Sequence, residues 1–138
     1  MWLRMSQEDS KVSRSIDLDA PASAVWDAIT DPSLLQQWLA DEVELDPEAG
    51  GELACRTEGG EERRGTVERS EAGELMVFSW SAPGAAPSRV ELEIEALPDA
   101  TRLTVTETGL EAGGPLARFE WSARLESLRL CLASLAYA

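Results

Sequence analysis

The chain has 138 residues, of which 43% are hydrophobic and 28% charged, and its formal net charge is −14. This length predicts one compact domain whose core needs no disulfide or metal for support. The 26 acidic residues outnumber the 12 basic ones, so we expect no binding to nucleic acid or to an anionic membrane surface, because both attract basic proteins.

Histidine and cysteine usage narrows the possible chemistry further. The chain contains no histidine, which excludes Ser-His-Asp catalysis, Cys-His catalysis and histidine-bound zinc. Cys55 and Cys131 are too few for a four-thiolate zinc site, and we expect two free thiols in the core. The sequence therefore predicts neither a metal site nor a cofactor.

The ends of the chain and its composition suggest where the protein works. No apolar run approaches the roughly 20 residues of a membrane span, and the first residues lack the apolar stretch of a signal peptide. We expect a cytoplasmic protein, and the abundance of Ala, Glu, Gly and Arg is typical of a high-GC bacterial genome. Residues 1–10 are predicted to be a flexible segment and residues 11–138 a single domain.

The first third of the chain predicts a strand followed by two short helices. Apolar and polar residues alternate over 12–18, which is typical of a half-buried strand. Pro21 and the pair Asp31-Pro32 are helix-start signals, and apolar residues follow each of them at helical spacing.

The rest of the chain predicts a run of strands and then one long helix. Alternating patterns separated by Gly- or Pro-containing turns indicate strands over 43–45, 52–56, 63–70, 75–81, 90–95 and 103–105. After a glycine-rich connector over 109–115, apolar residues recur at steps of four and three as far as the C-terminus. The stripe of this amphipathic helix consists of Trp121, Leu125, Leu128, Leu132 and Leu135.

Burial then determines the fold class. Strands joined by short turns pair as antiparallel neighbours, and the apolar face of such a sheet must be covered. The C-terminal helix is the only predicted element long enough to cover it. We therefore predict an α+β fold: a curved antiparallel sheet of about six or seven strands gripping a long C-terminal helix, with two short helices after the first strand. Glu91, Glu93 and Glu95 alternate with apolar residues, so we expect them on the solvent face rather than around a cation.

Four segments in this order resemble one known family. They are residues 20–32 (APASAVWDAITDP), residues 35–39 (LQQWL), the glycine pair 50–51, and the hairpin from 65–67 (GTV) to 77–80 (VFSW). They are similar to the START/SRPBCC helix-grip superfamily, in the branch of the heat-shock protein 90 ATPase activator C-terminal domain. The likeness extends over most of the chain.

The resemblance implies a deep, mostly apolar cavity between the sheet and the long helix. Relatives bind lipids, polyketides or other hydrophobic molecules there, while a minority catalyse cyclisation or hydrolysis and others act through protein partners. The branch shares no catalytic residues, so none is assigned here. Candidate lining residues are Trp38, Leu53, Cys55, Met76, Phe78, Trp80, Leu92, Trp121, Leu125 and Leu128. The alternative is that these side chains simply fill the core.

Two ionisable residues, Arg14 and Glu107, lie at the same alternate positions of their strands as the apolar residues, so their side chains are expected on the inward face. They could bind the carboxylate or hydroxyl group of a ligand, or they could both lie at strand ends in contact with water. General acid–base work by Glu107 would require a raised pKa in an apolar wall. The sequence leaves these alternatives open.

Three functions remain, and binding is favoured over catalysis. The leading hypothesis is a non-enzymatic binder of a hydrophobic small molecule, lipid or polyketide-like, in the cavity between sheet and helix. The first alternative is a chaperone-linked regulatory module that binds a protein partner, and the second is a cyclase or hydrolase that uses Glu107. An unpaired strand edge would also permit a homodimer.

Overall fold

The computed structural model describes residues 10–57, 59–109 and 115–135. The segment predicted to be flexible therefore lies outside the described residues, except for Ser10, which begins the first strand. In chain order the elements are β1 (Ser10–Leu18), α2 (Ala22–Thr30), α3 (Pro32–Leu35), β2 (Glu42–Leu45), β3 (Glu52–Arg56), β4 (Glu62–Glu71), β5 (Leu75–Ser81), β6 (Ser88–Ala96), β7 (Thr101–Gly109) and α4 (Pro115–Leu135).

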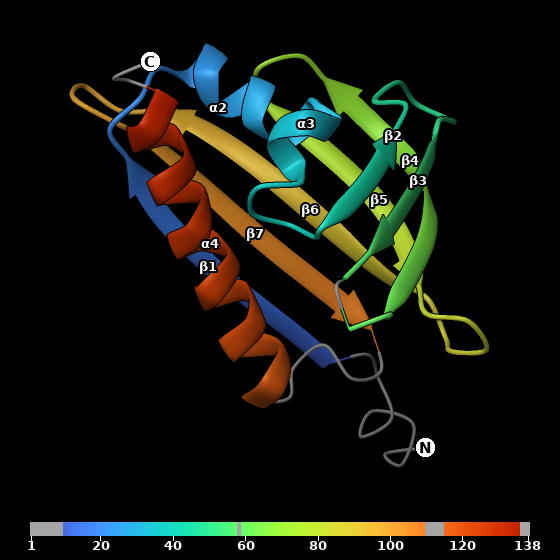
Figure 1. Ribbon diagram of the computed structural model, residues 1–138. Coiled ribbons are helices and arrows are strands. Elements are labelled where there is room, and N and C mark those ends of the chain that lie inside the picture. The colour runs from blue at the N-terminus through green and yellow to red at the C-terminus, as the bar shows by residue number, and fades with distance from the viewer. Residues whose placement is uncertain (1–9, 58, 110–114, 136–138) are drawn as a thin grey trace, which may run out of the picture.

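The seven strands form one antiparallel sheet in the order β1-β7-β6-β5-β4-β3-β2. Strands β2 to β7 are joined in sequence to their neighbours, while β1, the first strand, pairs with β7, the last. The sheet curves around α4, and α2 and α3 cover one end of the same concave face (Figure 1). The predicted helix-grip architecture is confirmed.

The two short helices form as their start signals predict. The Asp31 side chain accepts a hydrogen bond from the Ser33 backbone N–H at 2.9 Å, and Pro32 occupies the first helical position of α3. After α3 the Trp38 indole Nε1 donates to the Ala28 carbonyl oxygen of α2 at 2.9 Å. This bond holds the segment between α3 and β2 against α2, where the segment faces the interior.

The curvature of the sheet depends on close backbone contact at Gly65 in β4. A Cβ atom at this position would lie 1.6 Å from the Ser79 carbonyl oxygen of β5, so no other residue fits without a backbone shift. Two residues later the register between β4 and β5 shifts at Val67/Arg69, which marks a β-bulge. Together these features bend β4 and β3 toward α4.

The long helix packs on the sheet through its predicted stripe, with one correction. Trp121, Leu125, Leu128 and Leu132 are buried, but Leu135 is 43% exposed. The apolar contact therefore ends one turn before the helix does, and the prediction that Leu135 belongs to the buried stripe is wrong.

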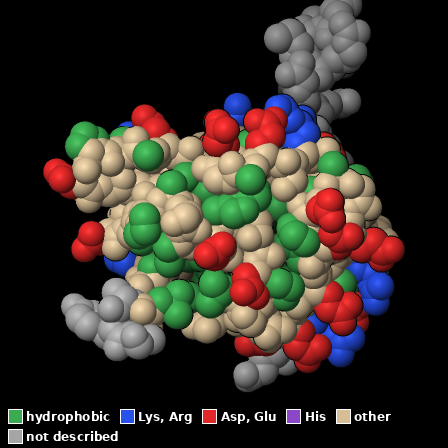
Figure 2. Space-filling view, turned by 90° about the horizontal axis from the view of Figure 1, so that it is seen from above, with side chains coloured by type: hydrophobic (Ala, Val, Ile, Leu, Met, Phe, Trp, Pro, Cys, Tyr) green, Lys and Arg blue, Asp and Glu red, His purple; other side chains and the backbone are tan. Residues whose placement is uncertain are grey.

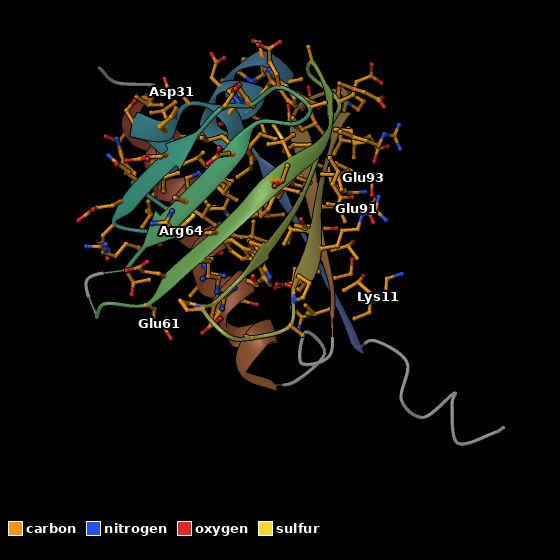
Figure 3. The ribbon with its side chains drawn as sticks, turned by 90° about the vertical axis from the view of Figure 1, so that its right-hand side faces the viewer. Lys11, Asp31, Glu61, Arg64, Glu91 and Glu93 are labelled. Carbon is orange, nitrogen blue, oxygen red and sulfur yellow. The ribbon has the colours of Figure 1, made fainter. Side chains whose placement is uncertain are left out.

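Charged side chains occupy the surface and the outer face of the sheet. Glu91 and Glu93 point away from α4 (Figure 3), and Glu93 and Glu95 are exposed, as their alternation with apolar residues predicts. Acidic side chains are also spread over the end of the molecule that carries α2 and α3 (Figure 2). In the part of the chain that the structure describes, no group of three or more Cys, Asp or Glu side chains could hold a metal ion, and no helix is long and apolar enough to cross a membrane.

Candidate functional site

The concave face of the sheet and the inner side of α4 enclose the core. All the predicted lining residues except Arg14 are buried there. Residues of both parities are apolar in β5, so its sequence does not say which of them face inward; in the structure the even-numbered residues do. Six predicted residues border one enclosed pocket: Trp38, Leu53, Met76, Phe78, Leu92 and Trp121. The remaining walls of this apolar pocket are Ile29, Leu35, Leu39 and Leu45.

The deep cavity that the family resemblance implies is not open. The apolar pocket has a volume of only about 10 Å³, which is near the minimum that a single water molecule occupies. Side chains from the sheet, from α3 and from α4 fill nearly all the space between the described elements. The expectation of a deep open cavity is therefore wrong for this state of the chain, because large residues such as Trp38, Met76 and Trp121 occupy it.

A wider groove lies directly outside the apolar pocket. It runs between the segment that follows α3, the hairpin of β3 and β4, and the outer edge of α4, and its volume is about 390 Å³. Trp38 and Leu39 line both the groove and the apolar pocket, so the two are adjacent. We call this the α3–α4 groove, and it is lined by Gln36, Gln37, Trp38, Leu39, Ala40, Asp41, Thr57, Glu61, Glu120, Ala123 and Arg124.

At the far end of the sheet from α2, the interior becomes polar around Glu107. This carboxylate is 6% exposed and accepts three hydrogen bonds. Nε1 of Trp80 donates to one oxygen at 2.8 Å, Nε1 of Trp121 donates to the other at 2.8 Å, and the Ser88 hydroxyl donates at 2.5 Å. The alternative that Glu107 lies at a strand end in water is therefore wrong, since α4 closes over it.

Two arginines cover the indole rings that hold Glu107. The guanidinium carbon of Arg63 lies 4.5 Å from the centre of the Trp80 ring, and that of Arg124 lies 5.7 Å from Trp80 and 4.9 Å from Trp121. The two indoles are stacked, with ring centres 6.2 Å apart. Burial lowers the pKa of Arg124, and the neighbouring charge of Arg63 lowers it further, while Glu120 and Glu107 act in the opposite direction.

The two cysteines are free thiols, as predicted, and both are buried. Burial raises the pKa of Cys55 to about 11, although Arg124 and Arg63 partly counteract the effect of burial. Burial also raises the pKa of Cys131. Both groups are therefore protonated near neutral pH and unsuited to act as nucleophiles or metal ligands.

Arg14 does not join the interior. It is half-buried at the edge of the sheet, where its Nε donates to the Ser122 hydroxyl of α4 at 3.3 Å. It lines a separate outer groove of about 610 Å³ between β1 and α4, together with Leu125. The structure thus separates Arg14 from Glu107, although both share inward parity, and Leu128 is part of the packed core.

Sequence reasoning missed Arg63, Arg124 and Ser88 as members of this site. Arg124 follows Trp121 by three residues, so it lies on the same side of the helix. Arg63 lies opposite the buried Cys55 in the register of β3 and β4, and it shares that residue's inward face. The three-residue spacing from Trp121 to Arg124 could have pointed to Arg124 from the sequence alone. Arg63 could be found only once the pairing of β3 with β4 was known.

The arrangement offers recognition rather than reaction. Both oxygens of Glu107 already accept hydrogen bonds, so this carboxylate is poorly placed to take a proton from a substrate. The groove itself offers a ligand the Trp38 ring, apolar side chains, polar and acidic side chains, and the Arg124 guanidinium.

The sequence was compared with families and with curated proteins. Residues 19–133 match the model of the family described as Activator of Hsp90 ATPase homolog 1-like protein. The comparison with curated proteins gave no match. The family match extends over most of the described chain, including strands β2 to β7, the groove and the arginines above Trp80.

Solved structures share the fold. DynU16, a protein of the dynemicin biosynthetic locus, is 22% identical with a TM-score of 0.81, over 91% of this chain and 48% of DynU16. The chain thus spans about half the length of that protein. CalU16 from Micromonospora echinospora is 27% identical with a TM-score of 0.76, over 88% of this chain and 73% of CalU16. The Aha1 dimer from Colwellia psychrerythraea is 16% identical with a TM-score of 0.72, over 86% of this chain and 92% of Aha1.

Proposed function

Because the chain belongs to the Activator of Hsp90 ATPase homolog 1-like family, a branch of the START/SRPBCC helix-grip superfamily, we propose that it is a non-enzymatic binder of a hydrophobic small molecule. The ligand, a lipid or polyketide-like compound, lies in the α3–α4 groove and extends into the apolar pocket below it. Binding moves Trp38 and Leu39 apart and enlarges the pocket.

The observation that carries this proposal is the position of the groove above the apolar pocket. Small-molecule sites are usually about 300–1,000 Å³ in volume and mostly apolar, with a few polar groups. The groove alone, at about 390 Å³, falls in this range, and Trp38 and Leu39 are its common wall with the apolar pocket. The apolar pocket alone is too small for any such ligand.

The wall between the groove and the pocket belongs to a segment that can move independently of the sheet. Gln36 to Asp41 connect α3 to the short edge strand β2, and the Trp38 side chain is held through its bond to the Ala28 carbonyl oxygen. The backbone N–H groups of Trp38 and Leu39 also donate to the Leu35 carbonyl oxygen, and the Gln36 side chain accepts a hydrogen bond from the Val43 N–H. These few hydrogen bonds restrain the segment less than the ladder restrains a central strand. Ligand entry through this segment leaves the rest of the fold intact.

Tryptophan fluorescence tests the proposal directly. We expect fatty acids, aromatic polyketides or simple arenes to change the emission of the wild-type chain in a saturable way. The change should be largely lost in Trp38→Phe and retained in Trp26→Phe, because Trp26 lies on α2 outside the groove and the apolar pocket. Flat titrations of the wild-type chain across all three ligand classes would contradict the proposal.

A partner-binding module is the second candidate, and the charge of the chain favours it. The net charge of −14 would steer a basic protein surface toward this one. The test is the ATPase rate of an Hsp90 chaperone with and without the chain, at low and high salt. A salt-sensitive change in rate would support this candidate, and an unchanged rate would leave the small-molecule function as the better explanation.

Catalysis by Glu107 is the least supported of the three functions, because the hydrogen bonds from Trp80, Trp121 and Ser88 occupy its oxygens. The predicted cytoplasmic location and the predicted homodimer remain predictions. Sedimentation of the purified chain distinguishes monomer from dimer.

A further inference from the structure

The two arginines above Trp80 differ from most arginines of the protein. Arg56, Arg69, Arg89, Arg102 and Arg129 each form an ion pair with a carboxylate. Arg63 and Arg124 form no ion pair and no hydrogen bond with the residues that the structure describes; they contact aromatic rings instead. Their N–H donors are therefore available to another group.

The buried carboxylate of Glu107 does not use these donors. Glu107 accepts its hydrogen bonds from Trp80, Trp121 and Ser88, and its charge acts on Arg124 only through space. Glu120 also acts on Arg124 through space. Among the described residues, neither carboxylate accepts a hydrogen bond from the two guanidiniums. Partly buried cations without a hydrogen-bonded partner are costly, so a ligand that supplies a negative charge here is favoured.

The position of the pair connects it to the proposed binding site. Arg124 lines the α3–α4 groove, and Arg63 covers the Trp80 ring in the same corner, opposite Cys55 in the sheet. A molecule in the groove therefore has the apolar wall of Trp38 and Leu39 on one side and the Arg124 guanidinium at its other end. Planar guanidiniums bind carboxylates through paired, charge-assisted hydrogen bonds.

We propose that Arg63 and Arg124 bind the carboxylate of an amphipathic ligand whose apolar body lies in the α3–α4 groove. This inference rests on the proposed small-molecule function and narrows its ligand to hydrophobic carboxylic acids. The contacts of both guanidiniums with indole rings restrict their motion before the ligand arrives, which reduces the entropy lost on binding.

Three acidic side chains, Asp41, Glu61 and Glu120, line the groove itself, so the preference for an anion depends on direct contact with the two guanidiniums. Charges beyond about 8–10 Å are largely screened at physiological salt, whereas partly buried groups in direct contact are screened much less. The net charge of −14 slows the approach of an anion, but the two guanidiniums act on it once it is in the groove. Added salt should therefore weaken the preference only slightly.

A matched pair of ligands tests the inference. Octanoate and octan-1-ol have the same alkyl chain and differ in the charged group, and tryptophan fluorescence gives the affinity of each at neutral pH. We expect the wild-type chain to bind octanoate about tenfold more tightly, as charge-assisted hydrogen bonds to arginine predict. Arg124→Gln and Arg63→Gln should each lose most of this preference and still bind octan-1-ol.

The control is Arg64→Gln, which removes the same charge from the neighbouring residue of β4. Arg64 is exposed on the face of the sheet turned away from α4 (Figure 3), so this variant should keep the tenfold preference. Circular dichroism of each variant verifies its fold. If only one of the variants Arg63→Gln and Arg124→Gln folds, that variant alone is sufficient for the test.

The possible outcomes separate the two proposals. If the wild-type chain binds both ligands equally, or if folded Arg124→Gln and Arg63→Gln keep the preference, the carboxylate inference is wrong and the small-molecule function stands. If neither ligand binds, the carboxylate inference is wrong, and the titrations with polyketides and arenes decide the small-molecule function. Loss of the preference in Arg64→Gln as well would show a general charge effect and would overturn the assignment to the interior pair.

Discussion

The two ends of the sheet–helix interior are built by different forces. The end beneath α2 and α3 is apolar, and residues such as Ile29, Met76 and Leu92 close it to about 10 Å³ of free space. The opposite end contains the buried carboxylate of Glu107, its three donors and the two arginines stacked on Trp80. The comparison shows that close packing of side chains holds one end of the interior together, whereas hydrogen bonds position the side chains at the other end.

The two ends therefore respond differently to change. At the apolar end, stability depends on the volume that each side chain fills, and a smaller residue leaves a void. At the polar end, it depends on donors and acceptors that must all be paired, because an unpaired buried group costs about 1–3 kcal/mol. A ligand in the α3–α4 groove contacts both kinds of environment, since Trp38 lies at one end and Arg124 at the other.

The largest expected effect is at the apolar end. Met76 is 1% exposed and lines the apolar pocket, so Met76→Ala should lower the free energy of unfolding by about 2–5 kcal/mol. The enlarged apolar pocket should stay dry and bind xenon or benzene. Urea denaturation measures the loss of stability, and the rise in melting temperature under xenon measures the binding.

Leu75→Ala is the matched control for Met76→Ala. Leu75 is the preceding residue of β5, it points to the other face of the sheet and it is only half-buried, so the loss should be clearly smaller. Equal losses in the two variants would mean that the pocket end is not packed as described.

The apolar end is also the part that the sequence predicts well. Alternation along the strands identified Leu53 and Leu92 as inward residues, and the helical repeat identified Trp121 and Leu128, whereas the inward face of β5, with Met76, was known only from the structure. These patterns are local, and every strand and helix follows from them with bounds that shift by only a few residues. What they do not contain is the fit of side-chain volumes, so the closed pocket replaced the expected open cavity.

The polar end could be predicted only in part. Parity pointed Glu107 inward, but its partners Trp80 and Trp121 lie 27 and 14 residues away in the chain. Only the sheet register and the rotation of α4 bring them together. Arg63 and Arg124 were missed for the same reason, because their relation to Trp80 exists in space and not in a local repeat.

The second prediction concerns Cys55, which borders both ends. Burial raises the pKa of its thiol to about 11 from an ordinary value of 9.0. Below pH 9 the thiol is protonated in both the folded and unfolded chain, so it adds no pH dependence. As the pH rises from about 9 to about 11, the unfolded chain loses this proton first, and the stability of the folded state should fall by about 3 kcal/mol.

The Cys55→Ala variant isolates this effect. Its free energy of unfolding should be lower at neutral pH, because a buried side chain is reduced in size, but its decline between pH 9 and pH 11 should be shallower than that of the parent chain. Denaturant titrations at several pH values provide both curves. Parallel curves would mean that Cys55 is not the desolvated group.

The smallest expected effect tests the polar end by itself. Glu107→Gln keeps the size of the side chain but replaces one acceptor oxygen with an NH₂ group, which is a donor. The Ser88 hydroxyl can rotate away, whereas the indole N–H groups of Trp80 and Trp121 cannot, so one of them loses its acceptor. We expect a loss of about 1–3 kcal/mol in the free energy of unfolding.

Glu93→Gln makes the same chemical change on the exposed face of the sheet and should leave stability nearly unchanged. If the two variants were equally stable, the buried carboxylate would not be the acceptor that orders this end, and the rings that carry Arg63 and Arg124 would be positioned by packing alone.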